Sequence, residues 1–210
     1  MIRQLSLTLI ATLTIVVFSA AAHANPVLVV GTSNQNATAT LNIISLSNNQ
    51  LVFSVTNTSA GIVTGIGFDL PGSVGPTSLA SSTAQSGNQN FGFNLSSGNV
   101  PQFSNATLDF ALLTHDGNFA GGDPQSGLAS GATSAIFTVS GDFSGLTEQQ
   151  IANAVFIRFQ ALTTNPDSDV GHGGTVNPVP EPTAMILLGT GLAGMVGAIR
   201  KRRKQAQIKQ

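Results

Sequence analysis

Seven segments of this 210-residue chain alternate apolar and polar side chains with a period of two. Because successive side chains of a β-strand point to opposite faces of the sheet, this period predicts strands with one buried face. Seven or eight such strands without a long amphipathic helix predict an all-β fold, an antiparallel β-sandwich, with a jelly roll as the alternative. The segments are residues 38–43, 51–56, 62–70, 91–95, 108–112, 135–139 and 155–159.

Residues 25–162 are expected to form this domain, which is long enough for one hydrophobic core. Residues 73–90, rich in Ser, Gly, Thr and Gln, are predicted to be a long mobile loop. One short helix is expected at residues 148–153, with Thr147 as its cap and Gln150 completing a capping box. Residues 163–178, rich in Gly, Asn and Asp, are expected to be a tether that follows the domain.

Charge is scarce, at 8% of residues against about a quarter in ordinary soluble domains. Residues 25–179 carry eight carboxylates and a single cation, Arg158, a net charge of −7 with histidine neutral. Nucleic-acid binding needs a basic face, so that class is excluded. The chain has no Cys, and residues 25–179 have no Lys, which excludes disulfides, thiolate metal sites, a Cys nucleophile and a Schiff base there.

The first 24 residues predict a secretory signal peptide. Arg3 provides a positive start, residues 5–18 are largely apolar, and Ala22 and Ala24 form a small-x-small site for signal peptidase. The mature chain would then begin at Asn25, outside the cytoplasm.

Residues 183–199 carry no charge and would span about 25 Å as a helix, the lower limit for crossing the hydrocarbon core. A transmembrane helix is therefore expected here, with residues 205–210 as a cytoplasmic tail. Gly189, Ala193 and Gly197 recur every four positions, a pattern that lets another helix approach closely. The helix would stop in the membrane at a basic cluster that stays on the cytoplasmic side: Arg200, Lys201, Arg202, Arg203 and Lys204.

Immediately before this helix stand Val179, Pro180, Glu181 and Pro182. The prolines favour extended, accessible backbone. Pro-Glu-Pro, a Gly-rich apolar span and a basic cluster, in that order over residues 179–204, resemble the PEP-CTERM sorting signal of exported bacterial proteins. The resemblance implies that an exosortase recognises and processes the chain near Pro180–Pro182, so that the membrane anchor is transient and these residues are a substrate of another enzyme.

Candidate sites within the domain are few. His115 beside Asp116 lacks a nucleophile elbow, and His115 with His172 forms no zinc motif, so no enzyme is expected. Calcium is the minority alternative, because Asp167 and Asp169 alternate with other oxygen-bearing residues before a glycine. A second oxygen-rich loop combines Asp116, Asn118 and Asp123.

The resulting expectation is an exported, non-enzymatic protein of the cell envelope or exopolysaccharide matrix. The alternative is a carbohydrate-binding surface module, assisted by calcium, although the absence of Trp and Tyr removes the usual sugar-stacking side chains. Ice binding is a third hypothesis that rests on the Thr-rich surface.

Overall fold

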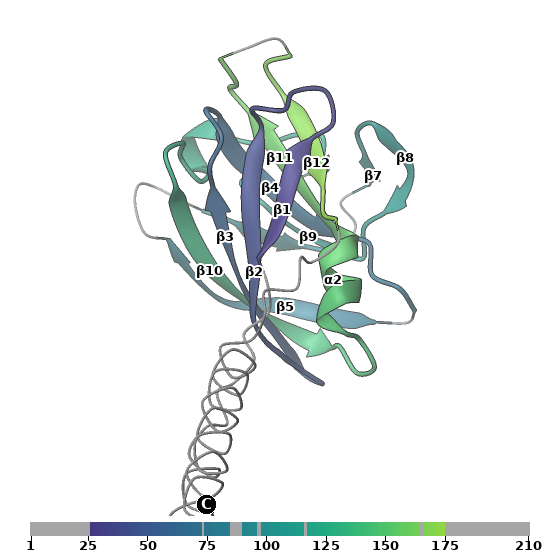
Figure 1. Ribbon diagram of the computed structural model, residues 1–210. Helices are drawn as coiled ribbons and strands as arrows, with labels where there is room; N and C mark the ends of the chain where they lie inside the picture. Colours follow the sequence, from purple (N-terminus) through teal and green to yellow (C-terminus); the bar gives the residue numbers. More distant parts are fainter. Residues whose placement is uncertain are drawn as a thin grey trace, which may run out of the picture. The chain divides into compact units, whose positions relative to one another are not determined.

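The computed structural model describes residues 26–72, 74–84, 90–95, 98–115, 117–163 and 166–174 (Figure 1). One α-helix, α2 (Glu148–Ala154), and one short 3-10 helix, η1 (Pro124–Ser126), occur in these residues. The strands are β1 (Val27–Gly31), β2 (Thr38–Ser47), β3 (Gln50–Asn57), β4 (Ile62–Phe68), β5 (Gly75–Ala84), β6 (Gly92–Asn94), β7 (Asn99–Val100), β8 (Phe103–Thr107), β9 (Phe110–Leu113), β10 (Thr133–Asp142), β11 (Val155–Gln160) and β12 (Asp169–His172).

Ten of these strands form one sheet in the order β5-β10-β3-β2-β1-β12-β11-β4-β9-β6, and β7 pairs with β8 in a separate hairpin. Neighbouring strands in this sheet pair antiparallel. The prediction of an all-β, antiparallel fold is therefore confirmed, and each of the seven alternating segments coincides with a strand.

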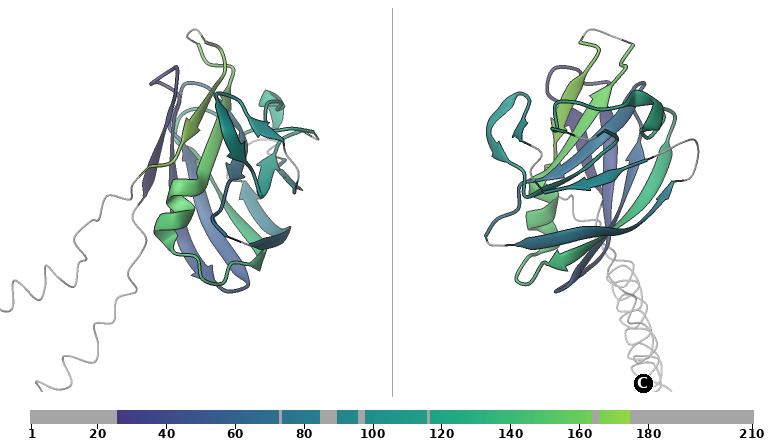
Figure 2. Two further views of the ribbon diagram at one scale, coloured as in Figure 1. Left: turned by 90° about the vertical axis from the view of Figure 1, so that its right-hand side faces the viewer. Right: turned by 180° about the vertical axis from the view of Figure 1, so that it is seen from behind.

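The sheet curls so that its two halves face each other (Figure 2). One half is β5-β10-β3-β2-β1 and the other is β12-β11-β4-β9-β6. Four strands separate β3, which carries Phe53, from β4, which carries Phe68, yet the centroids of these two rings are 5.3 Å apart. The halves are also hydrogen-bonded to each other, because β1 of one half pairs with β12 of the other. The structure therefore differs from the expected sandwich of two separate sheets: a single sheet, closed almost into a barrel, wraps one core.

Phenylalanine rings fill the space inside the curled sheet. Phe53 stacks on Phe137 at 5.5 Å, and Phe68 stacks on Phe110 at 4.9 Å. All four side chains are fully buried, and each comes from the inward-facing positions of a different strand. Aromatic contacts of this kind add to the free energy of burial, so these rings hold the two halves of the sheet together.

The helix α2 begins where the sequence predicts. Thr147 Oγ1 accepts a hydrogen bond from Gln150 N at 3.3 Å, and Gln150 Oε1 accepts one from Thr147 N at 2.8 Å. This reciprocal pair confirms the predicted capping box. The helix buries Ile151, Ala152 and Ala154 in the principal core, so it packs on the inner side of the sheet.

A second, smaller hydrophobic cluster lies on the outer side of β4, β9, β11 and β12. It is built under residues 99–119, and its buried members are Val100, Ala106, Leu108, Ala111, Leu113, Phe119, Phe156 and Val170. A Cβ atom at Gly67 of β4 would lie 2.5 Å from Leu108 Cδ1 and 2.9 Å from the ring of Phe119. Glycine at this position therefore lets the covering segment approach the sheet.

Residues 75–84, predicted as part of a mobile loop, form β5 at the edge of the sheet, and this part of the prediction is wrong. The register of β5 against β10 shifts twice, between Thr138 and Val139 and between Ser140 and Gly141. Each shift interrupts the alternation by one residue, so the strand shows no continuous period of two. Pro76 fits here because an edge strand leaves one row of backbone donors unpaired.

Strand β12 lies within residues 163–178, which were expected to be a tether. The structure instead inserts Asp169–His172 between β1 and β11 in the sheet. This strand has only four residues, and one of them is Gly171, which pairs directly with Gly31. Neither its length nor its residue types therefore predict a strand at this position.

The predicted signal peptide (residues 1–24) and the segment 179–204 lie outside the described residues. Among the residues that the structure describes, no helix has the length and apolar character needed to cross a membrane.

Replacing Phe53 by Ala should lower the free energy of unfolding by about 3–5 kcal/mol, because the ring is fully buried and contacts rings from both halves of the sheet. Urea unfolding followed by fluorescence of a bound dye or by circular dichroism measures this loss. Phe93→Ala is the matched control, since Phe93 is only partly buried and contacts one ring at 5.7 Å. Equal losses in the two variants would contradict a core centred on Phe53.

Candidate functional site

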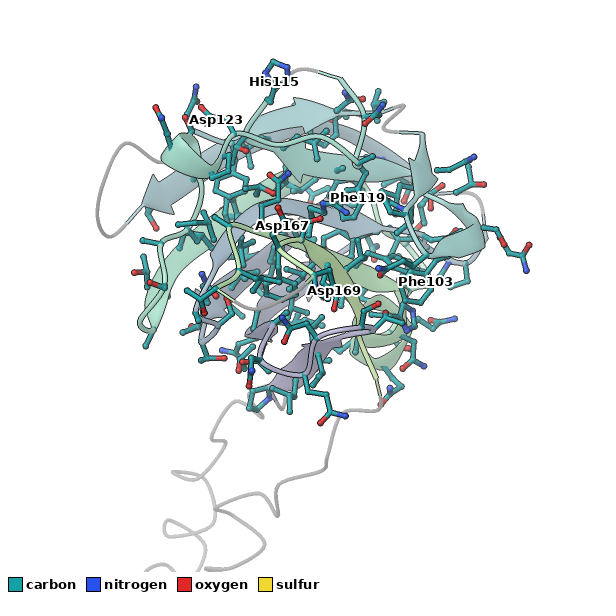
Figure 3. All side chains as sticks on the ribbon, turned by 90° about the horizontal axis from the view of Figure 1, so that it is seen from above. Phe103, His115, Phe119, Asp123, Asp167 and Asp169 are labelled. Atoms are coloured by element: carbon teal, nitrogen blue, oxygen red, sulfur yellow. The ribbon has the colours of Figure 1, made fainter. Side chains whose placement is uncertain are left out.

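The two carboxylates proposed for calcium lie in different environments (Figure 3). Asp167 is exposed, whereas Asp169 is completely buried. Asp169 Oδ2 accepts hydrogen bonds from the backbone N–H of Ser33 at 2.9 Å and of Asn34 at 2.6 Å, and its Oδ1 accepts one from Val170 N at 2.8 Å. Asp169 therefore holds the loop between β1 and β2 against the start of β12.

Arg158 provides the positive charge beside these carboxylates. Its side chain is 8% exposed on β11, Nη2 donates to Ser168 Oγ at 3.4 Å, and Asp169 and Asp167 are its nearest anionic neighbours. Burial lowers the pKa of Arg158 below its ordinary value, and the two carboxylates oppose that shift. A guanidinium in this position competes with any divalent cation for the same carboxylates.

In the second oxygen-rich loop, Asp123 and Asn118 accept local hydrogen bonds. Asp123 caps η1: its Oδ2 accepts from Ser126 Oγ at 2.7 Å and its Oδ1 accepts from Gln125 N at 2.9 Å. The hydrogen bond from the Ser126 hydroxyl, followed by that from Gln125 N, holds the pKa of Asp123 below its usual value. Asn118 Oδ1 accepts from Gly121 N at 3.1 Å, which closes a local turn. Asp116 lies outside the described residues.

The two histidines are not brought together into a metal site. His172 packs against Phe156 with ring centroids 4.5 Å apart, and Phe103 completes this aromatic group at 5.8 Å from His172. His115 lies near Asp123 in the loop that precedes η1. The described part of the chain contains no group of three or more His, Cys, Asp or Glu side chains placed to hold a metal ion.

The residues of the predicted sorting signal, Val179 to Pro182 and Arg200 to Lys204, lie outside the described residues, as do Ala22 and Ala24 of the signal-peptidase site. What the structure adds is the role of Arg158, which the sequence identifies only as the single cation of the domain. Its pairing with the chain around Ser168 depends on the ladder between β11 and β12. The four-residue sequence of β12 shows no alternation with a period of two, so it does not predict this ladder.

We predict that Asp169→Asn lowers the free energy of unfolding by about 1–3 kcal/mol, because an amide nitrogen would replace one of the two oxygens that accept backbone N–H groups. Urea titration measures this change, and amide hydrogen exchange at Ser33 and Asn34 should accelerate. Asp167→Asn is the control and should stay within about 0.5 kcal/mol, as expected for an exposed side chain. A rise in melting temperature with millimolar calcium that both variants abolish would instead support a cation site.

Trypsin should leave the folded domain intact, since residues 25–179 contain Arg158 as their only cleavage point and its side chain is 8% exposed within a strand. In urea above the unfolding midpoint, the same digestion should produce two fragments that join at Arg158. Mass spectrometry of the digests, with casein as a control for protease activity, measures both outcomes. Rapid cleavage at Arg158 in native buffer would show that β11 is not held in the sheet.

Comparison with known proteins gives one match. No curated protein and no solved structure shows significant similarity to this chain. The match covers 26 residues in which Pro180, Glu181 and Pro182 precede the apolar segment and the basic cluster. At residues 178–203 the chain therefore carries the PEP-CTERM protein-sorting motif.

Proposed function

We propose that this protein is exported by the general secretory route, processed by an exosortase near Pro180–Pro182, and delivered to the cell envelope or the exopolysaccharide matrix, where its β-domain acts without catalysis. The PEP-CTERM motif at residues 178–203 carries this proposal, because the motif indicates exosortase-dependent sorting of an exported protein.

The order of features in the C-terminal segment supports processing at the motif. Proline residues such as Pro180 and Pro182 favour an extended backbone, which is the form in which proteases bind their substrates. The 17 uncharged residues 183–199 would hold the segment in the membrane, and Arg200–Lys204 would keep its end on the cytoplasmic side. Under this proposal the domain faces outward and the membrane anchor is transient.

The side-chain chemistry of the domain supports a non-enzymatic role. Two of the carboxylates that the sequence singled out, Asp169 and Asp123, accept backbone hydrogen bonds, and the exposed His172 packs against aromatic rings. A general base must reach a substrate proton, and a nucleophile needs an adjacent base. In the residues that the structure describes, these groups instead stabilise loops and a strand.

Intact-mass measurement of the protein from the membrane and extracellular fractions of its own host tests the sorting proposal. We expect a mature chain that begins at Asn25 and ends close to Pro182, alone or with an added group. Changing Pro180, Glu181 and Pro182 together to Ala should leave the chain uncleaved, from Asn25 to Gln210, in the membrane fraction.

Glu148→Gln is the matched control, because it removes one carboxylate from the first turn of α2 and leaves the motif intact. Its mass should show the same processing as the parent protein. An unprocessed parent chain that stays in the membrane would overturn the exosortase proposal and leave a single-span surface protein.

A further inference from the structure

Among the described residues, no hydrophobic cluster covers the outer side of the half-sheet β5-β10-β3-β2-β1. The second hydrophobic cluster covers the outer side of the other half, and none of its members comes from these five strands. The helix α2 buries its apolar residues in the principal core, on the inner side. We call the outward-facing side chains of β5, β10, β3, β2 and β1 the uncharged face.

Strand register aligns the side chains of this face in rows across the sheet. In one row, Leu28 of β1 lies beside Thr40 of β2, Thr40 beside Thr56 of β3, and Thr56 beside Ser134 of β10. Paired residues share a face of the sheet and have Cβ atoms about 4.5–5.5 Å apart. The row therefore places three partly exposed, hydroxyl-bearing side chains beside one large exposed aliphatic side chain on the outer face.

The next row combines two hydroxyl groups, one amide and one aliphatic side chain. Asn42 of β2 pairs with Ser54 of β3, Ser54 with Ile136 of β10, and Ile136 with Thr83 of β5. A third row contains Val52 between hydroxyl-bearing neighbours on both sides. Hydroxyl, amide and aliphatic groups thus alternate in two dimensions over the face.

Two observations distinguish this face from ordinary surface. The five strands contain one charged residue, Asp142, at the last position of β10, although residues 25–179 carry eight carboxylates. Of the four large hydrophobic side chains that are exposed in the described residues, three belong to these strands: Leu28 at 59%, Ile44 at 41% and Ile136 at 36%. Covering such a face desolvates no charged group, so it suits a partner that is itself uncharged and supplies hydrogen bonds.

We propose that the uncharged face binds a neutral polysaccharide chain. Sugar rings combine hydroxyl groups at their edges with C–H groups on their faces, and this face offers hydrogen-bonding partners for the first and aliphatic contacts for the second. A polyanionic glycan or nucleic acid would meet a domain of net charge −7. The inference deepens the proposed function by naming the class of matrix component that the exported domain contacts.

The curvature of the sheet favours a linear polymer over a second copy of the protein. The face lies on the convex side of a sheet that curls around its core, as the contact between Phe53 and Phe68 requires. Two convex surfaces meet over a narrow strip, whereas a stable dimer buries about 1,200–2,000 Å². A flexible chain follows the curvature and meets several rows at once.

No aromatic side chain lies in the rows described above, so each sugar unit contributes little free energy, and affinity depends on several units bound together. Binding should therefore be detectable with long polymers and lost with short oligosaccharides. It should also persist in high salt, because no charges take part.

The test is co-sedimentation of the protein as it is isolated from its host, with mild detergent for the membrane fraction, with insoluble cellulose, curdlan, chitin and mannan. We expect saturable binding to at least one of them, unchanged in high salt, and no binding to dextran sulfate immobilised on beads. Absence of binding to all four neutral polymers, or stronger binding to dextran sulfate, would overturn the proposal.

Matched variants locate the binding surface. Leu28→Ser removes an apolar side chain that is 59% exposed on the face and should weaken binding about three- to tenfold. Leu95→Ser, 52% exposed outside these strands, should leave binding unchanged. Thr56→Glu should weaken binding about tenfold or more by placing a charge that the ligand cannot solvate, whereas Asn105→Glu on β8 should not.

Melting temperatures of all four variants control for folding. Equal binding by Leu28→Ser and Leu95→Ser would overturn the assignment to this face. A dimer in sedimentation velocity that Thr56→Glu dissociates, or thermal hysteresis that Thr56→Glu abolishes, would assign the face to a second copy or to ice instead. Because sedimentation with polysaccharide does not require processing at Pro180–Pro182, a failure of the sorting proposal is distinguishable from a failure of this one.

Discussion

The continuity of the sheet depends on the short seam between β1 and β12, and one buried carboxylate stabilises that seam. Only two residue pairs join the strands, Val30 with His172 and Gly31 with Gly171. Beyond the last pair, Thr32 N donates to Val170 O at 3.1 Å, and Asp169 accepts the next two backbone N–H groups of the loop. A buried charge is tolerated when hydrogen bonds and an opposite charge compensate its desolvation. Asp169 has both, because Arg158 lies beside it.

The close approach of β1 and β12 at this seam explains why Gly31 and Gly171 stand there. A Cβ atom at Gly31 would collide with Asp169 Oδ2, and one at Gly171 would lie 2.7 Å from Val30 O. Both positions therefore need the smallest residue so that the backbones and the carboxylate fit together. This contact joins the two half-sheets, whose inner faces the phenylalanine rings hold together, into one continuous curled sheet.

The sequence predicts those parts of the structure that are local. Alternation over residues 51–56 and 155–159 predicts β3 and β11, and Thr147 with Gln150 predicts the start of α2, because each signal lies within one element. The sorting motif is contiguous as well and was identified from its residues alone. Strand β5 was missed because bulges interrupt its alternation.

The uncharged face could not be predicted, because it depends on register between distant segments. Thr40 and Ser134 are 94 positions apart in the sequence and share a row only through Thr56. The sequence shows that the segments of β2 and β3 contain several threonines. Their arrangement in rows requires knowledge of which strands pair and in which register. The same holds for Arg158, whose position beside Ser168 and Asp169 follows from the ladder between β11 and β12.

The charged side chains of the domain are unevenly distributed over the fold. The single cation of residues 25–179 is buried, whereas several carboxylates lie at the ends of elements: Asp123 at η1, Asp142 at the end of β10 and Glu148 in the first turn of α2. Negative charge at the periphery keeps such a domain soluble and repels acidic polymers. The convex half-sheet, free of charge over its rows, is then the surface on which a neutral polymer meets the least electrostatic cost. The sorting motif at residues 178–203 and the strands of the uncharged face lie in separate parts of the sequence, so the proposed delivery and the proposed binding can be tested independently.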